Sequence, residues 1–243
     1  MADCTIHPIP LFEFRCDKSL MTYWLNFGQL ITLTGYVWYI EGTRDRILVD
    51  AGGNTEYMST VRGMPANEIQ SLDSGLGKIG VKVNDIDIVI LTHLHYDHIA
   101  QVSRFPNARI LVQQDELDFA QEPHPAVAGS FLQELFEGLN FEVINGDTRI
   151  CEEISVLSTP GHTPGGQSVC IKTAKGMAII PGLCTIRENF EPPLLVREKM
   201  PVIVPGIHVN VLDAYDSLLR IKQVADIVVP NHDPEYLEKS SIP

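Results

Sequence analysis

Short runs of β-branched and aromatic residues divide most of the chain into candidate strands. Residues 6–14, 36–41 and 46–50 carry such runs, and the third ends at Ala51-Gly52-Gly53, a typical strand terminus. Residues 86–91 form a continuous apolar run, which predicts a buried strand. By the same criteria, further strands are expected at residues 110–112, 141–144, 154–157, 169–172, 177–180 and 227–229.

Apolar residues at helical spacing separate these strands. Ile69, Leu72, Leu76 and Ile79 recur every three or four residues, as on one face of a helix. On this pattern, helices are expected at residues 69–79, 115–120, 132–139 and 211–224. Strands and helices therefore come in two similar halves. Two sheets with helices outside them would accommodate this order, so we expect a single layered α/β domain over residues 1–243.

Net charge and cysteine content limit which binding partners and which cellular location are expected. Acidic residues outnumber basic ones by 31 to 18, which gives a net charge of −13, and such a surface repels phosphate groups. We therefore expect no nucleic acid and no membrane as a partner. No signal peptide is visible, and the five cysteines include no Cys-x-x-Cys pair. A cytoplasmic location is expected, and a homodimer is left open.

Three imidazoles and a carboxylate follow the apolar run 86–91 within six residues. They are His93, His95, Asp97 and His98. In an extended loop, His93 and His95 point the same way and can hold one cation, while Asp97 and His98 can reach a second. Neutral imidazole and carboxylate suit zinc, iron or manganese.

Two further histidines stand in similar places. His162 follows the strand expected at 154–157, and His232 follows the strand expected at 227–229. Each comes after a turn that contains proline, so all of these side chains can converge at one edge of the layers. His7, His124 and His208 are expected to be ordinary histidines with hydrogen-bond partners. Of the three, His208 lies between a proline-rich loop and a predicted helix.

The motif His-x-His-x-Asp-His, followed by Gly161-His162 and then His232, resembles the metallo-β-lactamase superfamily. Within it, the chain looks most similar to N-acyl homoserine lactonase-type hydrolases. That resemblance rests on Tyr36-Val37-Trp38, Phe105-Pro106-Asn107-Ala108-Arg109, Arg187-Glu188-Asn189-Phe190 and Asn231-His232-Asp233.

The resemblance implies an αββα sandwich with one or two divalent metals, most simply zinc, at one edge of the sheets. It implies that a first metal is held by His93, His95 and His162. A second metal would be held by Asp97, His98 and His232. Asp50 would orient one of the ligand histidines.

One departure from the family pattern concerns the aspartate that bridges both metals. Counting back from Glu188-Asn189, Gly182 occupies its position, and Thr185 occupies that of a tyrosine near the substrate carbonyl. We therefore expect the second metal to bind weakly or not at all, and an aspartate placed at position 182 to strengthen it. Cys184 and Glu188 are candidate replacement ligands.

These features predict a hydrolase of a small-molecule ester or lactone such as an N-acyl homoserine lactone. Metal-bound hydroxide would be the nucleophile, and Asp97 would move the proton. The aromatic residues Tyr23, Trp24, Phe27, Tyr36 and Trp38 form either a substrate wall or ordinary packing. Alternatives are a thioester hydrolase of the glyoxalase II type, a mononuclear enzyme with isomerase, lyase or oxygen chemistry, and a metal-binding protein.

Overall fold

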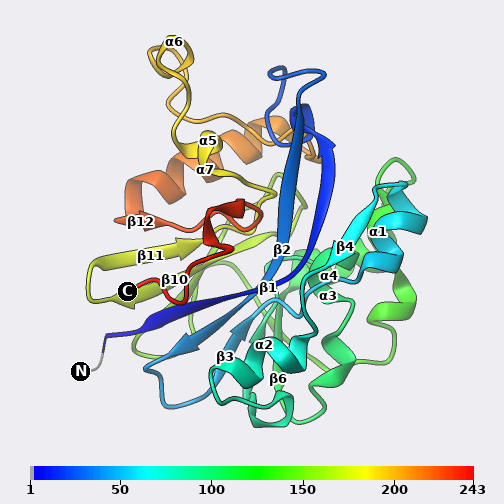
Figure 1. Ribbon diagram of the computed structural model, residues 1–243, viewed down its shortest axis with the longest axis vertical. Coiled ribbons are helices and arrows are strands. Elements are labelled where there is room, and N and C mark those ends of the chain that lie inside the picture. The colour runs from blue at the N-terminus through cyan, green and yellow to red at the C-terminus, as the bar shows by residue number, and fades with distance from the viewer. Residues whose placement is uncertain (1–2) are drawn as a thin grey trace.

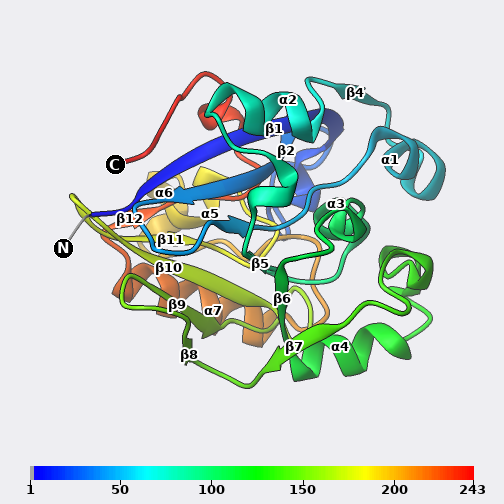
Figure 2. The ribbon, with the colours of Figure 1, turned by 90° about the horizontal axis from the view of Figure 1, so that it is seen from below.

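The computed structural model describes residues 3–243 and contains two sheets packed face to face (Figures 1 and 2). The seven strands of the first sheet are, in spatial order, β4 (Ala66–Glu68), β1 (Thr5–Asp17), β2 (Leu30–Glu41), β3 (Ile47–Val49), β5 (Ile88–Ile90), β6 (Arg109–Gln113) and β7 (Phe141–Ile144). The five strands of the second sheet are β12 (Ile227–Val228), β11 (Gly176–Ile180), β10 (Gln167–Thr173), β9 (Ile154–Ser158) and β8 (Thr148–Arg149).

Helices cover the outer faces of both sheets. Those packed against the first sheet are α1 (Thr55–Arg62), α2 (Leu72–Lys78), α3 (Tyr96–Ile99) and α4 (Gln114–Gln121). Those packed against the second sheet are α5 (Arg187–Phe190) and α7 (Val211–Val224), whereas α6 (Leu194–Arg197) buries no residue. Figure 2 shows α7 along the outer side of the second sheet and α2 on the opposite side of the molecule.

Side chains of single strands alternate between neighbouring layers, as the pleat requires. In β5, Ile88 and Ile90 pack between the two sheets, whereas Val89 packs toward the helices. In β11, Ile180 faces the first sheet and Ile179 faces α7. Three apolar clusters therefore fill the three spaces between four layers, which confirms the expected αββα sandwich. The expectation of a single domain over residues 1–243 stays a prediction.

The prediction of an α-helix at residues 132–139 is wrong. The structure has a 3-10 turn at Gln133–Leu135 instead, and Gly138 adopts a left-handed φ of 76° that ends any helical path. Backbone bonds such as Leu139 N–H to Phe136 O run over three residues. Phe136 is buried nevertheless, so the apolar spacing marks residues that pack on the core and does not mark an α-helix.

The helix expected at residues 69–79 begins only at Leu72, because Ser71 caps it with a side-chain hydrogen bond to Ser74 N–H. The sequence analysis missed α1 altogether, although Asn54 caps it in the same manner. Helix α7 has the bounds that the sequence predicts. Among the described residues, no helix is long and apolar enough to cross a membrane.

Candidate metal centre

The strand ends that precede the candidate ligands meet at one edge of the sandwich. In the first sheet β3 runs parallel to β5, so Asp50 and the loop that carries His93 follow neighbouring strand ends. In the second sheet His162 follows β9 and His232 follows β12. Strand β9 is antiparallel to β10, β10 is antiparallel to β11, and β11 is parallel to β12, so β9 and β12 point the same way. The sheets are joined at this edge by the bond from Gln167 N–H to Thr92 O at 2.9 Å.

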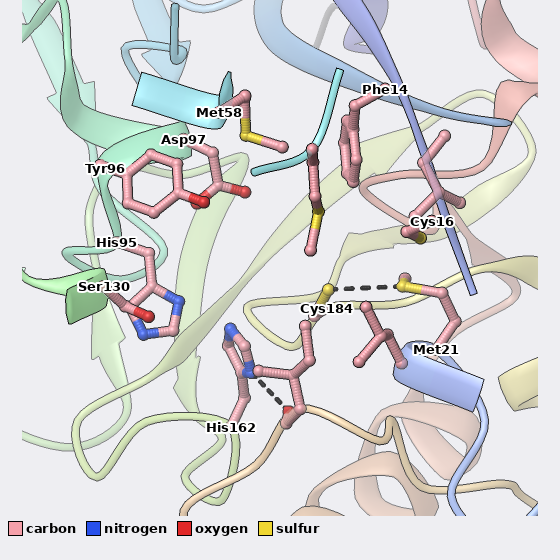
Figure 3. Close-up of a pocket in the computed structure, with 14 residues that line it drawn as sticks. Phe14, Cys16, Met21, Met58, His95, Tyr96, Asp97, Ser130, His162 and Cys184 are labelled. Atoms are coloured by element: carbon pink, nitrogen blue, oxygen red, sulfur yellow. Dashed lines mark hydrogen bonds between the residues drawn. The ribbon is translucent and has the colours of Figure 1, made fainter. Parts of the chain in front are cut away.

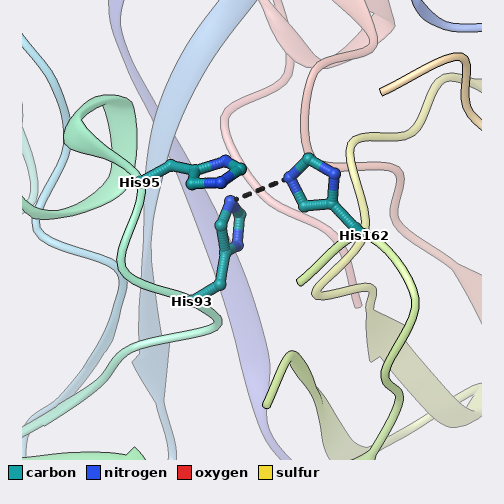
Figure 4. A group of neighbouring side chains, drawn as sticks. All are labelled: His93, His95 and His162. Carbon is teal, nitrogen blue, oxygen red and sulfur yellow. Dashed lines mark hydrogen bonds between the residues drawn. The ribbon is translucent and has the colours of Figure 1, made fainter. Parts of the chain in front are cut away.

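A first triad consists of His93, His95 and His162, and one ring nitrogen from each lies within 4.8 Å of the others (Figure 4). All three side chains are buried. His93 and His95 come from the loop after β5 and His162 from the turn after β9, so the two sheets each contribute to one triad. The Nε2 atoms of His93 and His162 are 3.2 Å apart.

Hydrogen-bond partners determine the tautomers of His93 and His162. The carbonyl of Ile207 can only accept, so His162 Nδ1 at 2.7 Å donates to it and Nε2 keeps its lone pair. Thr92 Oγ1 donates to Asp50, and it therefore accepts from His93 Nδ1 at 3.0 Å. Two lone pairs then face each other across 3.2 Å. Tetrahedral nitrogen ligands at zinc lie about 3.4 Å apart, so this geometry fits a cation between them.

A second triad consists of Asp97, His98 and His232, with one donor atom of each again within 4.8 Å of the others. Asp97 and His98 lie on the short helix α3, not in the extended loop that the sequence suggested. His232 Nδ1 donates to Thr34 O at 3.1 Å. The Nε2 atoms of His98 and His232 are buried without a hydrogen-bond partner, and Asp97 Oδ2 lies 3.5 and 3.7 Å from them.

Asp50 supports both triads. Its carboxylate accepts from His98 Nδ1 at 2.7 Å and from Thr92 N–H at 2.8 Å, and the Thr92 hydroxyl links it to His93. Asp50 is fully buried and has a left-handed φ of 61°, which is uncommon for residues other than glycine. The strand end therefore turns sharply to point this carboxylate at the histidines.

Burial and neighbouring charges set the protonation of the site. Burial lowers the pKa of His162 and of His232 to about 4 and that of His93 well below its usual value. Burial also opposes charge on His98, but Asp97 and Asp50 outweigh it and raise the pKa of His98 to about 9. Burial likewise opposes ionisation of Asp97, yet His98 and His232 lower its pKa. A cation that binds the second triad therefore releases a proton from His98.

An apolar cavity opens beside the triads (Figure 3). His95, Asp97 and His162 line one part of it, and its volume is about 40 Å³. Most of the remaining lining residues are apolar or carry sulfur: Phe14, Cys16, Leu20, Met21, Leu33, Met58, Met64, Cys184 and Ile207. No lysine or arginine is among the described residues that line it.

The aromatic substrate wall is not found. Tyr36 and Trp38 are buried in the cluster between the two sheets, so they belong to the core. Tyr23, Trp24 and Phe27 do not line the cavity, and Trp24 is 72% exposed. The stretch that contains them contributes Leu20 and Met21 to the cavity instead.

Gly182 leaves no room for a side chain. A Cβ at this position would lie 2.1 Å from Gln167 O, and the Gly182 N–H donates to Ser168 Oγ at 3.0 Å. The structure therefore opposes the expectation that an aspartate here would strengthen the second metal, because the backbone must shift to admit its Cβ. Thr185, at the position of the lactonase tyrosine, is buried and bonded to Asn231 Oδ1.

The two candidate replacement ligands lie elsewhere. Cys184 Sγ lies 3.6 Å from Met21 Sδ in the cavity wall, and it belongs to neither triad. Glu188 pairs with Lys18 and accepts from Asn26 Nδ2 at 2.9 Å. Among the described residues, Asp97 is thus the single carboxylate within the two triads.

The other three histidines do not join the triads. His7 contacts Glu41 Oε2 at 2.8 Å, His124 is exposed, and His208 donates to Pro205 O at 2.7 Å and packs against Tyr23. The sequence analysis did not single out Thr92 or the cavity residue Met58. Nothing in the sequence marks Met58, whereas Thr92 precedes the first motif histidine directly.

An αββα sandwich with two histidine-rich triads at one sheet edge defines a class of metal-dependent hydrolases. The chain belongs to the metallo-beta-lactamase superfamily, which matches its residues 30–232. This confirms the family resemblance that the motifs predict.

Several relatives are N-acyl homoserine lactonases. An N-acyl homoserine lactonase of a Bacillus species is 30% identical over 93% of this chain and 92% of its own. One from Bacillus thuringiensis is 29% identical over 96% and 94%. A solved N-acyl homoserine lactone hydrolase, with its product N-hexanoyl-L-homoserine at the catalytic metal centre, has a TM-score of 0.78 and 25% identity, covering 98% of this chain and 96% of its own. The expectation of a hydrolase is therefore confirmed.

Proposed function

We propose that this enzyme hydrolyses the ring ester of N-acyl homoserine lactones or closely similar lactones, with zinc as its divalent metal. The observation that carries the proposal is the pair of triads beside an apolar cavity, because the ligand atoms of each triad lie within 4.8 Å of one another. His93, His95 and His162 would hold one ion and Asp97, His98 and His232 the other. A divalent metal bound there lowers the pKa of water toward 7 and polarises a carbonyl oxygen.

The side chains around this centre have separable roles. Asp97 lies in both the second triad and the cavity wall, so its carboxylate can accept a proton from the attacking water and return it to the leaving alkoxide. Met21, Met58 and Phe14 exclude water from the part of the cavity that receives the apolar group of the substrate. Thioether side chains adapt to different shapes, which suits a cavity that must widen to admit an acyl chain.

The cavity favours a lactone over a glutathione thioester. A thioester of that kind carries carboxylates, and a site for it would benefit from basic side chains. The described residues that line the cavity include neither lysine nor arginine, and the net charge of the chain is −13. We therefore keep the thioester hydrolase as the second candidate. The same charge argues against nucleic acid as a substrate.

A hydrolysis assay tests the proposal. The zinc-loaded protein is mixed with N-hexanoyl homoserine lactone, and ring opening is followed by the acid that it releases. The same assay is run with a glutathione thioester and with protein stripped by chelator. Metal-dependent acid release from the lactone alone supports the proposal. Faster turnover of the thioester, or ring opening by stripped protein, would contradict it.

A further inference from the structure

Glu116 is a buried carboxylate that lies outside both triads. It belongs to helix α4, and its side chain has no exposed surface. Burying a charged group costs free energy unless hydrogen bonds compensate for it. No lysine or arginine pairs with Glu116 among the described ion pairs, so its partners must explain why the residue is there.

The two carboxylate oxygens of Glu116 bind two different loops. Oε1 accepts from Leu94 N–H at 2.8 Å, and Oε2 accepts from Gly165 N–H at 3.1 Å. Leu94 stands between His93 and His95, and Gly165 lies three residues after His162. These two loops therefore carry all three members of the first triad. Neither hydrogen bond reaches a member of the second triad, although α3, which carries Asp97 and His98, begins directly after His95.

The packing around Gly165 shows how closely the second loop approaches α4. A Cβ at position 165 would lie 2.0 Å from Glu116 N, so the loop backbone rests directly on the first turn of the helix. A glycine is required for this approach. Helix α4 thus contacts the loop that carries His162 directly. The Glu116 carboxylate, which bonds both loops, fixes the distance between this loop and the loop that carries His93 and His95.

We propose that Glu116 is a positioning residue that sets the geometry of the first triad. It belongs to neither triad and does not line the cavity. It holds the backbone on both sides, so that the Nε2 atoms of His93 and His162 stay 3.2 Å apart, close to the spacing of two ligands of one cation. Partners that orient ligands in this way typically contribute about 10- to 100-fold to metal affinity. The inference rests on the metal centre of the proposed function.

The separation of the triads allows a selective test. A His232→Ala chain keeps only the first triad complete, and a His162→Ala chain keeps only the second. Glu116→Gln is introduced into each. The amide keeps the size of the side chain, but its NH2 group cannot accept a hydrogen bond, so one of the two backbone N–H groups loses its acceptor. The affinity for Zn²⁺ is measured by competition with a coloured chelator. We expect about tenfold weaker binding in the His232→Ala chain and a clearly smaller loss in the His162→Ala chain, because Glu116 makes no hydrogen bond to the second triad.

Asn189→Ala is the matched control. Asn189 is also buried and also bonds backbone groups of separate segments, Met21 O at 2.7 Å and Ile203 O at 2.8 Å, but neither segment carries a ligand. We expect it to lower thermal stability and to leave Zn²⁺ affinity unchanged. Should Glu116→Gln fail to fold, Glu116→Asp keeps the charge but is too short to reach both loops, and the same selective loss is expected.

The outcomes separate the two proposals. Equal Zn²⁺ affinity with and without Glu116→Gln in the His232→Ala chain overturns the role of Glu116 and leaves the metal centre standing. Equal weakening of both triads also overturns it, because it shows a general loss of structure. If the His232→Ala chain with intact Glu116 binds no Zn²⁺, the first triad is not a metal site and the proposed function fails.

Discussion

At the scale of single residues, the acceptors behind the histidines matter as much as the histidines themselves. Ile207 O, Thr34 O and the pair Thr92–Asp50 each take an Nδ1 proton, and they come from segments distant in sequence. Fixing Nδ1 as the donor leaves Nε2 as the ligand atom and orients the ring. A sequence motif can locate the rings, but only the folded chain shows which nitrogen of each ring faces the site.

We expect His95→Ala to abolish lactone hydrolysis while the fold persists. His95 belongs to the first triad and lines the cavity, and within the first apolar cluster its ring contacts only Phe131 among the ring contacts described. Activity should fall by more than about 100-fold, since even outer partners of ligands contribute 10- to 100-fold. Circular dichroism checks the fold. His124→Ala, at an exposed histidine, is the control and should keep full activity. Turnover by His95→Ala at the wild-type rate would disprove the assignment.

Gly182→Asp should lower the free energy of unfolding and leave the metal content unchanged. The new Cβ would meet Gln167 O at 2.1 Å, so strand β10 or the loop must shift before any carboxylate can approach the triads. Overpacking of this kind costs about 1–3 kcal/mol. Urea unfolding and elemental analysis provide the measurements. Gly182→Ala should be destabilised to a similar extent, because the clash begins at Cβ. A higher zinc content in Gly182→Asp would refute the steric explanation.

At the scale of elements, the sequence predicted α7 and most strands well, because these strands are short apolar runs and α7 has a helical period, but it missed the short strands β4 and β8. Val89 and Ile90 pack into different layers, and α7 buries Leu218 and Ile221 on one face. The same criterion failed at residues 132–139, where apolar side chains pack on the core from 3-10 turns. It also missed α1, whose cap at Asn54 depends on local hydrogen bonding that periodicity does not reveal.

Gly161→Ala should disrupt the turn that connects β9 to His162. Gly161 has a φ of 123°, and a Cβ there would lie 2.1 Å from the backbone nitrogen of Ala214 in α7. Such backbone strain costs about 1–3 kcal/mol. We expect lower thermal stability together with weaker Zn²⁺ binding, because His162 must move with the turn. Gly80→Ala is the control, since Gly80 also has a positive φ but lies in open space. Unchanged zinc affinity in Gly161→Ala would show that the turn does not position His162.

At the scale of the whole molecule, the sandwich brings together two sheets that each hold part of the site. In the first triad, His93 and His95 follow a strand of the first sheet and His162 follows a strand of the second. In the second triad, His232 follows a strand of the second sheet. Metal binding therefore bridges the halves of the molecule. The family resemblance could predict this convergence from the motifs, but not the steric exclusion at Gly182 or the apolar cavity walls, because both depend on contacts between distant segments.

This bridging predicts that Zn²⁺ raises the stability of the whole chain in two unequal steps. A ligand that binds only the folded state stabilises it by about 2.7 kcal/mol at 100 times its dissociation constant. The first ion should bind tightly. Two dications about 3.5 Å apart repel by on the order of 20 kcal/mol at an effective dielectric of 20. Asp97 is the single carboxylate of the two triads, with Asp50 behind it, so this repulsion is only partly offset and the second ion should bind more weakly.

Thermal unfolding during a zinc titration, paired with release of zinc into excess chelator, measures both steps. The midpoint of unfolding should rise steeply up to one equivalent and then more slowly. Release should show a fast phase and a slow phase of about one ion each. His232→Ala and His162→Ala should each retain a single phase, because each keeps one complete triad. Two ions that leave the wild-type chain together in one slow phase would show that the carboxylates Asp97 and Asp50 suffice to hold a symmetric pair.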